Sequence, residues 1–315
     1  MPQSNSVSSS VTRKSPPPHV RLGPLTRLLL SGARWQGADA FPAWQVWADD
    51  VERVLAFLQS EGRLGAFLAV TQSARTPQHR DARLAEARGA FYLHRNGFCV
   101  VEWEPLGEGT TRGEVTVSLR GSTNVFVEVK QPGWQGERLP RRVADSRALT
   151  PEARERCLAR MKQEKYINLE GGAVGSHLAA MDVVRRNALP KLTDKMPNLV
   201  VVVDDLSVTP VGLPGLPLYV EREFAKPDHD PDDHDDVFTF ERLGGVFFLQ
   251  PEANNSQRID YRADFVENPG ALPSCALPPA VAAVLTRLRE DSRLRVERRY
   301  AGRPSLFEIL NRKRR

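Results

Sequence analysis

The segment of residues 124–130, with the sequence NVFVEVK, constrains the fold more than any other part of the chain. Side chains of a β-strand alternate between its two faces. The three valines therefore share one face and can join a core, while Phe126, Glu128 and Lys130 share the other. Charged side chains this close to a core are usually paired or bound to a metal. The segment is predicted to be a strand that holds a glutamate beside a lysine.

A second strand is predicted just before it. Residues 114–119, with the sequence EVTVSL, alternate between polar and apolar, and the turn-forming residues 121–123 separate the two segments. A loop of those three residues would place Glu114 across from Lys130 and Thr116 across from Glu128. The polar side chains would then share one face of a hairpin, an arrangement that a register based on a two-residue loop would break.

The remaining periodicity predicts a mixed β-sheet flanked by helices, an α/β fold. Helices are expected over residues 43–72 (divided at Gly62), 81–93, 151–166, 176–193 (with a kink at Pro190) and 279–300. Strands are expected over residues 98–103, 114–119, 124–130, 199–203, 244–249 and 261–265. The strand at residues 98–103 is predicted to be buried, with Cys99 inert inside it.

Composition narrows the class of protein. The chain of 315 residues is 41% hydrophobic and 26% charged, with a net charge of +5, as in soluble globular proteins. No apolar run approaches the roughly 18 to 20 residues that a membrane helix needs, so no membrane partner is expected. The first fifteen residues are polar and give no secretory signal. Three cysteines, odd in number and far apart, favour a reducing, cytoplasmic setting.

Two carboxylates and a lysine on one face of a hairpin are the groups that metal-assisted phosphodiester hydrolysis needs. Mg²⁺ prefers oxygen ligands and takes one or two protein carboxylates together with waters and substrate phosphate. A nearby lysine can orient the attacking water and offset the charge that grows in the transition state. The alternative is an exposed glutamate–lysine pair worth less than about 1 kcal/mol.

The order of elements and four residues resemble the PD-(D/E)xK, or restriction endonuclease-like, superfamily of nucleases. The matching residues are Glu86 in the helix of residues 81–93, Glu114 at the start of the hairpin, and Glu128 with Lys130 in its second strand. The segment with Arg185, Arg186 and Lys191 before the apolar strand also looks like the family's helix-to-strand crossover. The resemblance covers about residues 81–205.

The resemblance implies a site and an activity. Glu114, Glu128 and the Val129 carbonyl would bind Mg²⁺, for which Mn²⁺ would substitute. Lys130 would position the attacking water, and Glu86 would orient water or support a second metal. The implied reaction is hydrolysis of DNA that leaves a 5′-phosphate. The family usually has aspartate where this chain has Glu114, and Glu104 is the reserve candidate for that ligand.

The chain is expected to divide into four segments, of which only the nuclease core comes from the resemblance. Residues 1–40 are expected to be a disordered, basic, Pro- and Ser-rich tail in which residues 22–30 dock locally. Residues 41–80 are expected to be a helical segment that packs on the core, and residues 81–205 the restriction endonuclease-like nuclease core. Residues 206–315 are expected to form an α+β extension that ends in an amphipathic helix and a basic tail.

DNA is the expected partner, with RNA left open. Four basic residues are candidate contacts to the nucleic-acid backbone: Arg154, Arg160, Lys162 and Lys165. Endonuclease and exonuclease action both stay open, as does the oligomeric state, a homodimer included. The alternative function is a catalytically inactive protein of the same fold that binds nucleic acid or supports assembly. The acidic run of residues 228–236 is predicted to be a solvated loop rather than a metal site.

Overall fold

The computed structural model describes residues 21–32, 44–74, 77–131, 180–181, 183–203, 216–225, 239–253 and 259–300. The chain divides into two compact units. The first comprises Met1–Ala87 and Ala253–Ile259, and the second comprises Arg88–Glu252 and Asp260–Arg315. Within the described residues, no helix combines the length and the apolar composition that a membrane span requires.

The first unit is helical. It contains α1 (Pro24–Gly32), α2 (Trp44–Ser60), α3 (Leu64–Ser73) and the beginning of α4 (Pro77–Arg95). The predicted division at Gly62 is confirmed, because this residue has a φ of +68° between α2 and α3. The carboxylate of Glu52 in α2 accepts hydrogen bonds from the backbone N–H groups of Leu25 (3.1 Å) and Thr26 (2.8 Å) at the start of α1. This contact docks α1 on α2, as expected for residues 22–30; residues 1–20 of the predicted tail lie outside the described residues.

The second unit contains a six-stranded sheet in the order β1-β2-β3-β4-β5-β6. Its strands are β1 (Phe98–Trp103), β2 (Val115–Leu119), β3 (Val125–Lys130), β4 (Asn198–Val203), β5 (Gly245–Ala253) and β6 (Ile259–Glu267). β1, β2 and β3 are antiparallel neighbours, whereas β3, β4 and β5 are parallel. The predicted α/β architecture with a mixed sheet is therefore confirmed. β5 and β6 come from the segment expected to be an extension, and they continue the same sheet.

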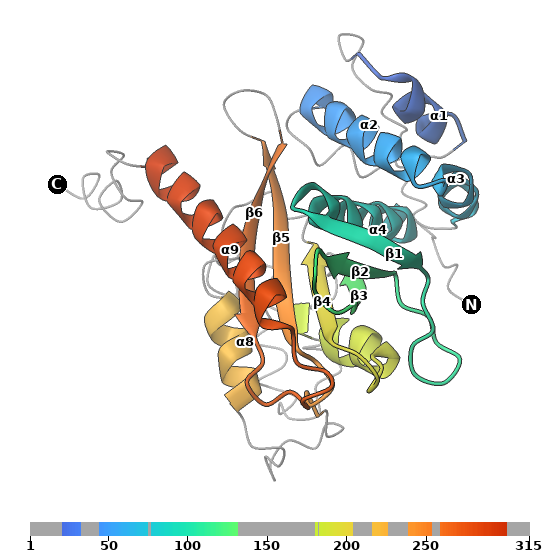
Figure 1. Ribbon diagram of the computed structural model, residues 1–315. Coiled ribbons are helices and arrows are strands. Elements are labelled where there is room, and N and C mark those ends of the chain that lie inside the picture. The colour runs from blue at the N-terminus through green and yellow to red at the C-terminus, as the bar shows by residue number, and fades with distance from the viewer. Residues whose placement is uncertain are drawn as a thin grey trace, which may run out of the picture. The chain divides into compact units, whose positions relative to one another are not determined.

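Both faces of the sheet are covered by apolar contacts. On one face, Tyr92 of α4 contacts the rings of Phe247 in β5 and Tyr261 in β6. The helix α9 (Pro279–Tyr300) packs beside β6, where Ser292 Oγ accepts a hydrogen bond from the Ala263 N–H at 2.9 Å (Figure 1). The opposite face carries a buried cluster that includes Phe126, Val200 and Phe248, with side chains from the segment before β4 and from α8 (Leu216–Ala225).

Two local predictions are wrong. β1 is the first strand of the sheet, so it lacks a neighbour on one side within the described sheet, and only Phe98 of its residues is fully buried. Cys99 is exposed there rather than buried. The predicted helix up to residue 193 instead ends as a π-helical turn, Val184–Ala188, followed by a 3₁₀ turn, Leu189–Lys191. Pro190 has no N–H to donate, so the α-helical hydrogen-bond pattern cannot continue through it, and the last turn is 3₁₀.

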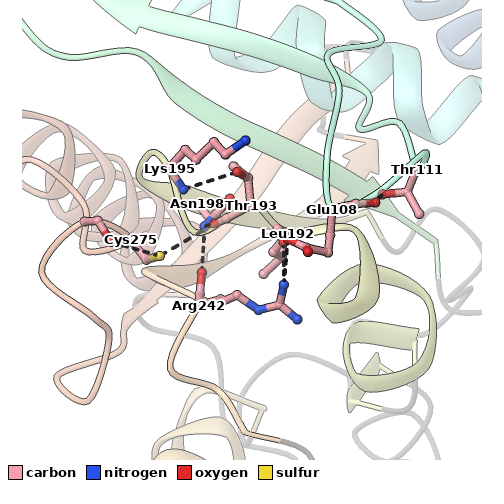
Figure 2. Close-up of polar contacts among 9 residues, drawn as sticks. Glu108, Thr111, Leu192, Thr193, Lys195, Asn198, Arg242 and Cys275 are labelled. Atoms are coloured by element: carbon pink, nitrogen blue, oxygen red, sulfur yellow. Dashed lines mark hydrogen bonds and ion pairs between the residues drawn. The ribbon is translucent and has the colours of Figure 1, made fainter.

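Asn198, the first residue of β4, joins three loops at one end of the sheet. Its Nδ2 donates hydrogen bonds to the carbonyls of Thr193 at 2.6 Å and Arg242 at 2.7 Å (Figure 2). Its backbone N–H donates to the Cys275 carbonyl at 3.1 Å. Arg242 also donates from Nη1 to the Leu192 carbonyl at 3.0 Å. These bonds fix the turn that precedes β4 against the sheet.

We predict that Asn198→Ala destabilises the protein by about 2 to 4 kcal/mol, because two backbone carbonyls lose their amide donor in a buried setting. The free energy of unfolding measured in urea tests this expectation. Asn124→Ala, in the exposed turn before β3, is the matched control and should change that free energy by less than about 0.5 kcal/mol. Equal effects of the two substitutions would contradict the role assigned to Asn198.

Candidate active site at the carboxyl end of β3

Glu114, Glu128 and Lys130 meet where β3 ends. Glu128 and Lys130 belong to β3, and Glu114 directly precedes β2. Because the two strands are antiparallel, the start of β2 lies beside the end of β3. The backbone N–H of Glu114 donates a hydrogen bond to the Val127 carbonyl at 3.2 Å, which fixes the two strands at this point. The predicted grouping of these three residues on one face is thus present.

The predicted register of the hairpin is wrong by two residues. Val115 pairs with Val127 and Thr116 with Phe126, so the next step of the ladder puts Glu114 level with Glu128 rather than Lys130. The last paired residues of the hairpin are Val117 and Val125, so residues 118–124 connect the paired segments rather than the three residues expected. A shift of two residues preserves the faces of both strands, because side chains alternate with a period of two. The polar residues consequently still share one face.

The charges of the three residues are in direct contact. Lys130 Nζ forms an ion pair with Glu128 Oε1 and a longer one, 3.5 Å, with Glu114 Oε1. Lys130 Nζ also donates a hydrogen bond to the Val129 carbonyl at 3.0 Å. The Lys130 ammonium therefore lies between the two carboxylates and beside the backbone oxygen expected to complete a metal site.

Lys191 is a fourth member of the cluster, and sequence reasoning did not place it in the site. Its Nζ lies 2.7 Å from Glu128 Oε1 and 4.0 Å from Glu114 Oε1. The residue ends the 3₁₀ turn before β4, in the segment that resembles the family's crossover. That resemblance was the only signal available, because no strand or helix periodicity relates residue 191 to residue 128. We call Glu114, Glu128, Lys130 and Lys191 the Glu–Lys cluster.

Lys191 is positioned by the loop between β1 and β2. The Glu108 N–H donates a hydrogen bond to the Lys191 carbonyl at 3.1 Å. Gly107 permits this approach, since a Cβ at that position would lie 2.1 Å from the same carbonyl oxygen. Figure 2 shows Glu108 on this loop beside Leu192 and Arg242, and Arg242 Nη1 contacts Glu108 Oε2 at 3.3 Å. The turn that carries Lys191 is therefore fixed on one side by the β1–β2 loop and on the other by the bonds that Arg242 and Asn198 donate to the carbonyls of Leu192 and Thr193.

The carboxylate of Glu128 is fully buried, with no exposed area. Burial raises the pKa of Glu128 above its ordinary value; the Lys130 ammonium lowers it in part, and the Glu114 carboxylate raises it further. Among the described residues, neither carboxylate oxygen of Glu128 accepts a hydrogen bond of good geometry, and both ammonium groups form their ion pairs with Oε1. Glu128 Oε2 is thus a buried acceptor with unused bonding capacity, which is costly unless a ligand supplies the partner.

The oxygen atoms present suit a hard divalent cation. Phe126 donates its N–H to the Pro197 carbonyl beside β4, and the Val127 carbonyl accepts the Glu114 N–H, so alternation turns the Val129 carbonyl toward the β2 side as well. Two carboxylates and one carbonyl agree with the ligands that Mg²⁺ takes from proteins while it retains waters. The part of the chain that the structure describes contains no group of three or more His, Cys, Asp or Glu side chains able to hold a metal. A cation held by two carboxylates and one carbonyl would take its remaining ligands from water.

The other predicted site residues have different surroundings. Glu86 lies in the part of α4 that belongs to the first unit, where its carboxylate forms an ion pair with Arg83 at 2.7 Å. Glu104, the reserve ligand, is exposed and has a positive φ of 55° in the loop after β1. The predicted nucleic-acid contacts Arg154, Arg160, Lys162 and Lys165, and the acidic run of residues 228–236, lie outside the described residues.

Comparison of this chain with protein-family models, with curated proteins and with solved structures finds no match.

The raised pKa of Glu128 predicts how stability depends on pH. Glu128 binds its proton more tightly in the folded than in the unfolded chain, so its protonation favours folding. That contribution is complete below the unfolded pKa of about 4.3 and is lost as the pH rises through the higher folded pKa. Glu128→Gln, which mimics the neutral acid, should therefore raise the free energy of unfolding at pH 7 and flatten its decline above pH 4.

Urea unfolding at a series of pH values measures this effect, with Glu102→Gln on the exposed part of β1 as the control for loss of one negative charge. A Glu128→Gln protein less stable than the wild type at pH 7 would show that the ionised carboxylate stabilises the fold.

Proposed function

We propose that the protein is a Mg²⁺-dependent nuclease that hydrolyses phosphodiester bonds of DNA. One observation carries the proposal: Glu114, Glu128 and Lys130 converge at the carboxyl end of β3, where the buried Glu128 Oε2 accepts no hydrogen bond from the described residues. Open α/β sheets commonly bind ligands beyond the carboxyl ends of their strands. These three residues are among the four that sequence resemblance assigned to a restriction endonuclease-like nuclease; the fourth, Glu86, lies in the first unit.

The sheet topology supports the same class of fold. A helix, α4, precedes a strand and a hairpin, and a crossover then leads to β4, parallel to β3. This succession is the element order on which the resemblance rests. The parallel pairing of β3 with β4 brings the crossover, and Lys191 with it, to the same end of the sheet as Glu128. A Glu-x-Lys sequence that occurred by chance would not be expected to lie beside both a second acidic residue and this crossover.

Each member of the cluster has a role in this proposal. Glu114, Glu128 and the Val129 carbonyl would hold Mg²⁺, with Mn²⁺ as a substitute, and the bound metal would polarise the phosphate and lower the pKa of a bound water. Lys130 would orient that water and offset charge on the phosphate oxygens. Glu86 stays a proposed auxiliary residue. For such a role, the Glu86 carboxylate would have to leave its ion pair with Arg83.

The charge pattern is compatible with a polyanionic substrate. Two exposed basic residues, Arg186 and Lys195, flank Lys191 in sequence. The chain as a whole carries a net charge of +5. Phosphate contacts of this kind supply most of the affinity that does not depend on base sequence. DNA is the proposed substrate, in a cytoplasmic setting, and the basic segment with Arg154 and Lys165 stays a proposed backbone contact.

A second candidate function is a nucleic-acid-binding or assembly protein that retains the fold without catalysis. Charge balance in the cluster favours it: two glutamates are matched by two lysines, so the Glu–Lys cluster is neutral without a metal. Glutamate rather than aspartate at position 114 points the same way. Such a protein would bind DNA with a steep salt dependence and gain nothing from Mg²⁺.

We expect the purified protein to cut plasmid, linear duplex or single-stranded DNA in the presence of Mg²⁺ and to stop when EDTA is added. Lys130→Ala and Glu128→Ala should each lower the single-turnover rate by a factor on the order of 10² to 10³, because each removes a group that acts on the transition state. Product lengths and end groups on labelled DNA measure the reaction.

Arg27→Ala and Glu102→Ala are the matched controls, since each removes one charge, of the same sign as Lys130 and Glu128 respectively, from an exposed position. Cleavage by Lys130→Ala and Glu128→Ala at the wild-type rate would exclude this site. Absence of cleavage of every substrate with Mg²⁺ or Mn²⁺, together with salt-dependent DNA binding, would favour the second function.

A further inference from the structure

We propose that Lys191 is a positioning residue that occupies the metal position in the metal-free protein. Its ammonium lies between Glu114 and Glu128, and a divalent cation can bind these carboxylates only after that ammonium leaves. This inference rests on the proposed function, because it concerns regulation of the same site. It assigns to Lys191 a contact that blocks the site until metal is present.

The contacts of the Lys191 ammonium resemble those expected of a bridging cation. Nζ lies 2.7 Å from Glu128 Oε1 and 4.0 Å from Glu114 Oε1, so one positive group contacts both carboxylates. Glu128 has no exposed area, and neither of its oxygens accepts a well-directed hydrogen bond from the described residues. An incoming cation therefore competes for Oε1 with an ammonium already there, while Oε2 is available to complete its binding.

Lys191 is better placed to leave than Lys130. The side chain of Lys191 is 30% exposed, whereas that of Lys130 is 13% exposed. Lys130 extends from a strand flanked by β2 and β4, and its Nζ donates to the Val129 carbonyl at 3.0 Å. Lys191 ends a turn, and its long aliphatic stem can carry the ammonium toward water without movement of the backbone.

The surrounding loops restrict this motion to the side chain. The Lys191 carbonyl accepts the Glu108 N–H, and Gly107 approaches the same oxygen too closely for any side chain at that position. Arg242 donates to the Leu192 carbonyl at 3.0 Å on the other side. Rotation about side-chain bonds, rather than displacement of the turn, is then the route by which Lys191 vacates the carboxylates.

Charge balance explains why one lysine should leave. Two glutamates and two lysines sum to zero, and a divalent cation added to the intact Glu–Lys cluster would bring the total to +2. Departure of the Lys191 ammonium reduces the total to +1. A phosphodiester carries one negative charge and would neutralise that remainder. The released ammonium stays within side-chain reach of the site and can contact the same phosphate.

Mn²⁺ binding, measured by calorimetry and by the electron paramagnetic resonance of free Mn²⁺, tests this inference without DNA. Lys191→Met keeps the apolar stem and removes the charge, and we expect it to bind Mn²⁺ about tenfold more tightly than the wild type. Lys195→Met removes the same charge from an exposed neighbour and should leave the affinity within about twofold.

Equal affinity of Lys191→Met and the wild type, or equal tightening by Lys195→Met, would overturn the inference. A wild type that cuts DNA with Mg²⁺ while Lys191→Met shows unchanged Mn²⁺ affinity would refute the role of Lys191 and leave the nuclease proposal standing. A third outcome is that the wild type neither cuts DNA nor binds Mn²⁺, whereas Lys191→Met binds Mn²⁺ tightly. This outcome would refute the nuclease proposal and support the role of Lys191. Absence of Mn²⁺ binding in both proteins would overturn both.

Discussion

The placement of a carboxylate without solvent exposure at the end of a central strand is the constraint on which the site depends. Glu128 shares its sheet face with Phe126 and Val200, so its charge stands beside an apolar cluster. An unpaired charge in such a place would be prohibitively costly, and the two ammonium groups on Oε1 reduce that cost. The raised pKa of Glu128 indicates that they do not remove it. Residues that reduce stability in this way are characteristic of sites retained for chemistry.

The fold gathers the cluster from three places in the chain by strand pairing. Antiparallel pairing brings the start of β2 to the end of β3, and parallel pairing with β4 brings the crossover turn to the same end. Hydrogen bonds from the β1–β2 loop and from Arg242 then fix the turn that carries Lys191. The site is therefore supported by regular strands on one side and by hydrogen-bonded loops on the other. Rigid support of this kind is what a metal-assisted reaction requires of its ligands.

Sequence reasoning recovered the elements better than their contacts. The period-two pattern of residues 124–130 was enough to predict a strand with Glu128 and Lys130 on one face, because alternation is a local property. The hairpin register depended on where the pairing of the two strands ends; it ends at Val117 and Val125, which moves the partner of Glu114 by two residues without changing its face. Lys191 could not be placed from local pattern, since its contact with Glu128 spans a crossover. Burial of β1 was overestimated because an apolar sequence does not by itself distinguish an edge strand from a central one.

The central claim is that the Glu–Lys cluster is a site for a divalent cation. Its most direct test is a crystal structure of the protein grown with Mn²⁺, with anomalous diffraction recorded to locate the metal. We expect an anomalous peak bound by the carboxylates of Glu114 and Glu128 and by the Val129 carbonyl, with the Lys191 ammonium displaced. Both lysines still on Glu128 and no anomalous peak at saturating Mn²⁺ would contradict the claim and identify the cluster as a structural ion-pair network.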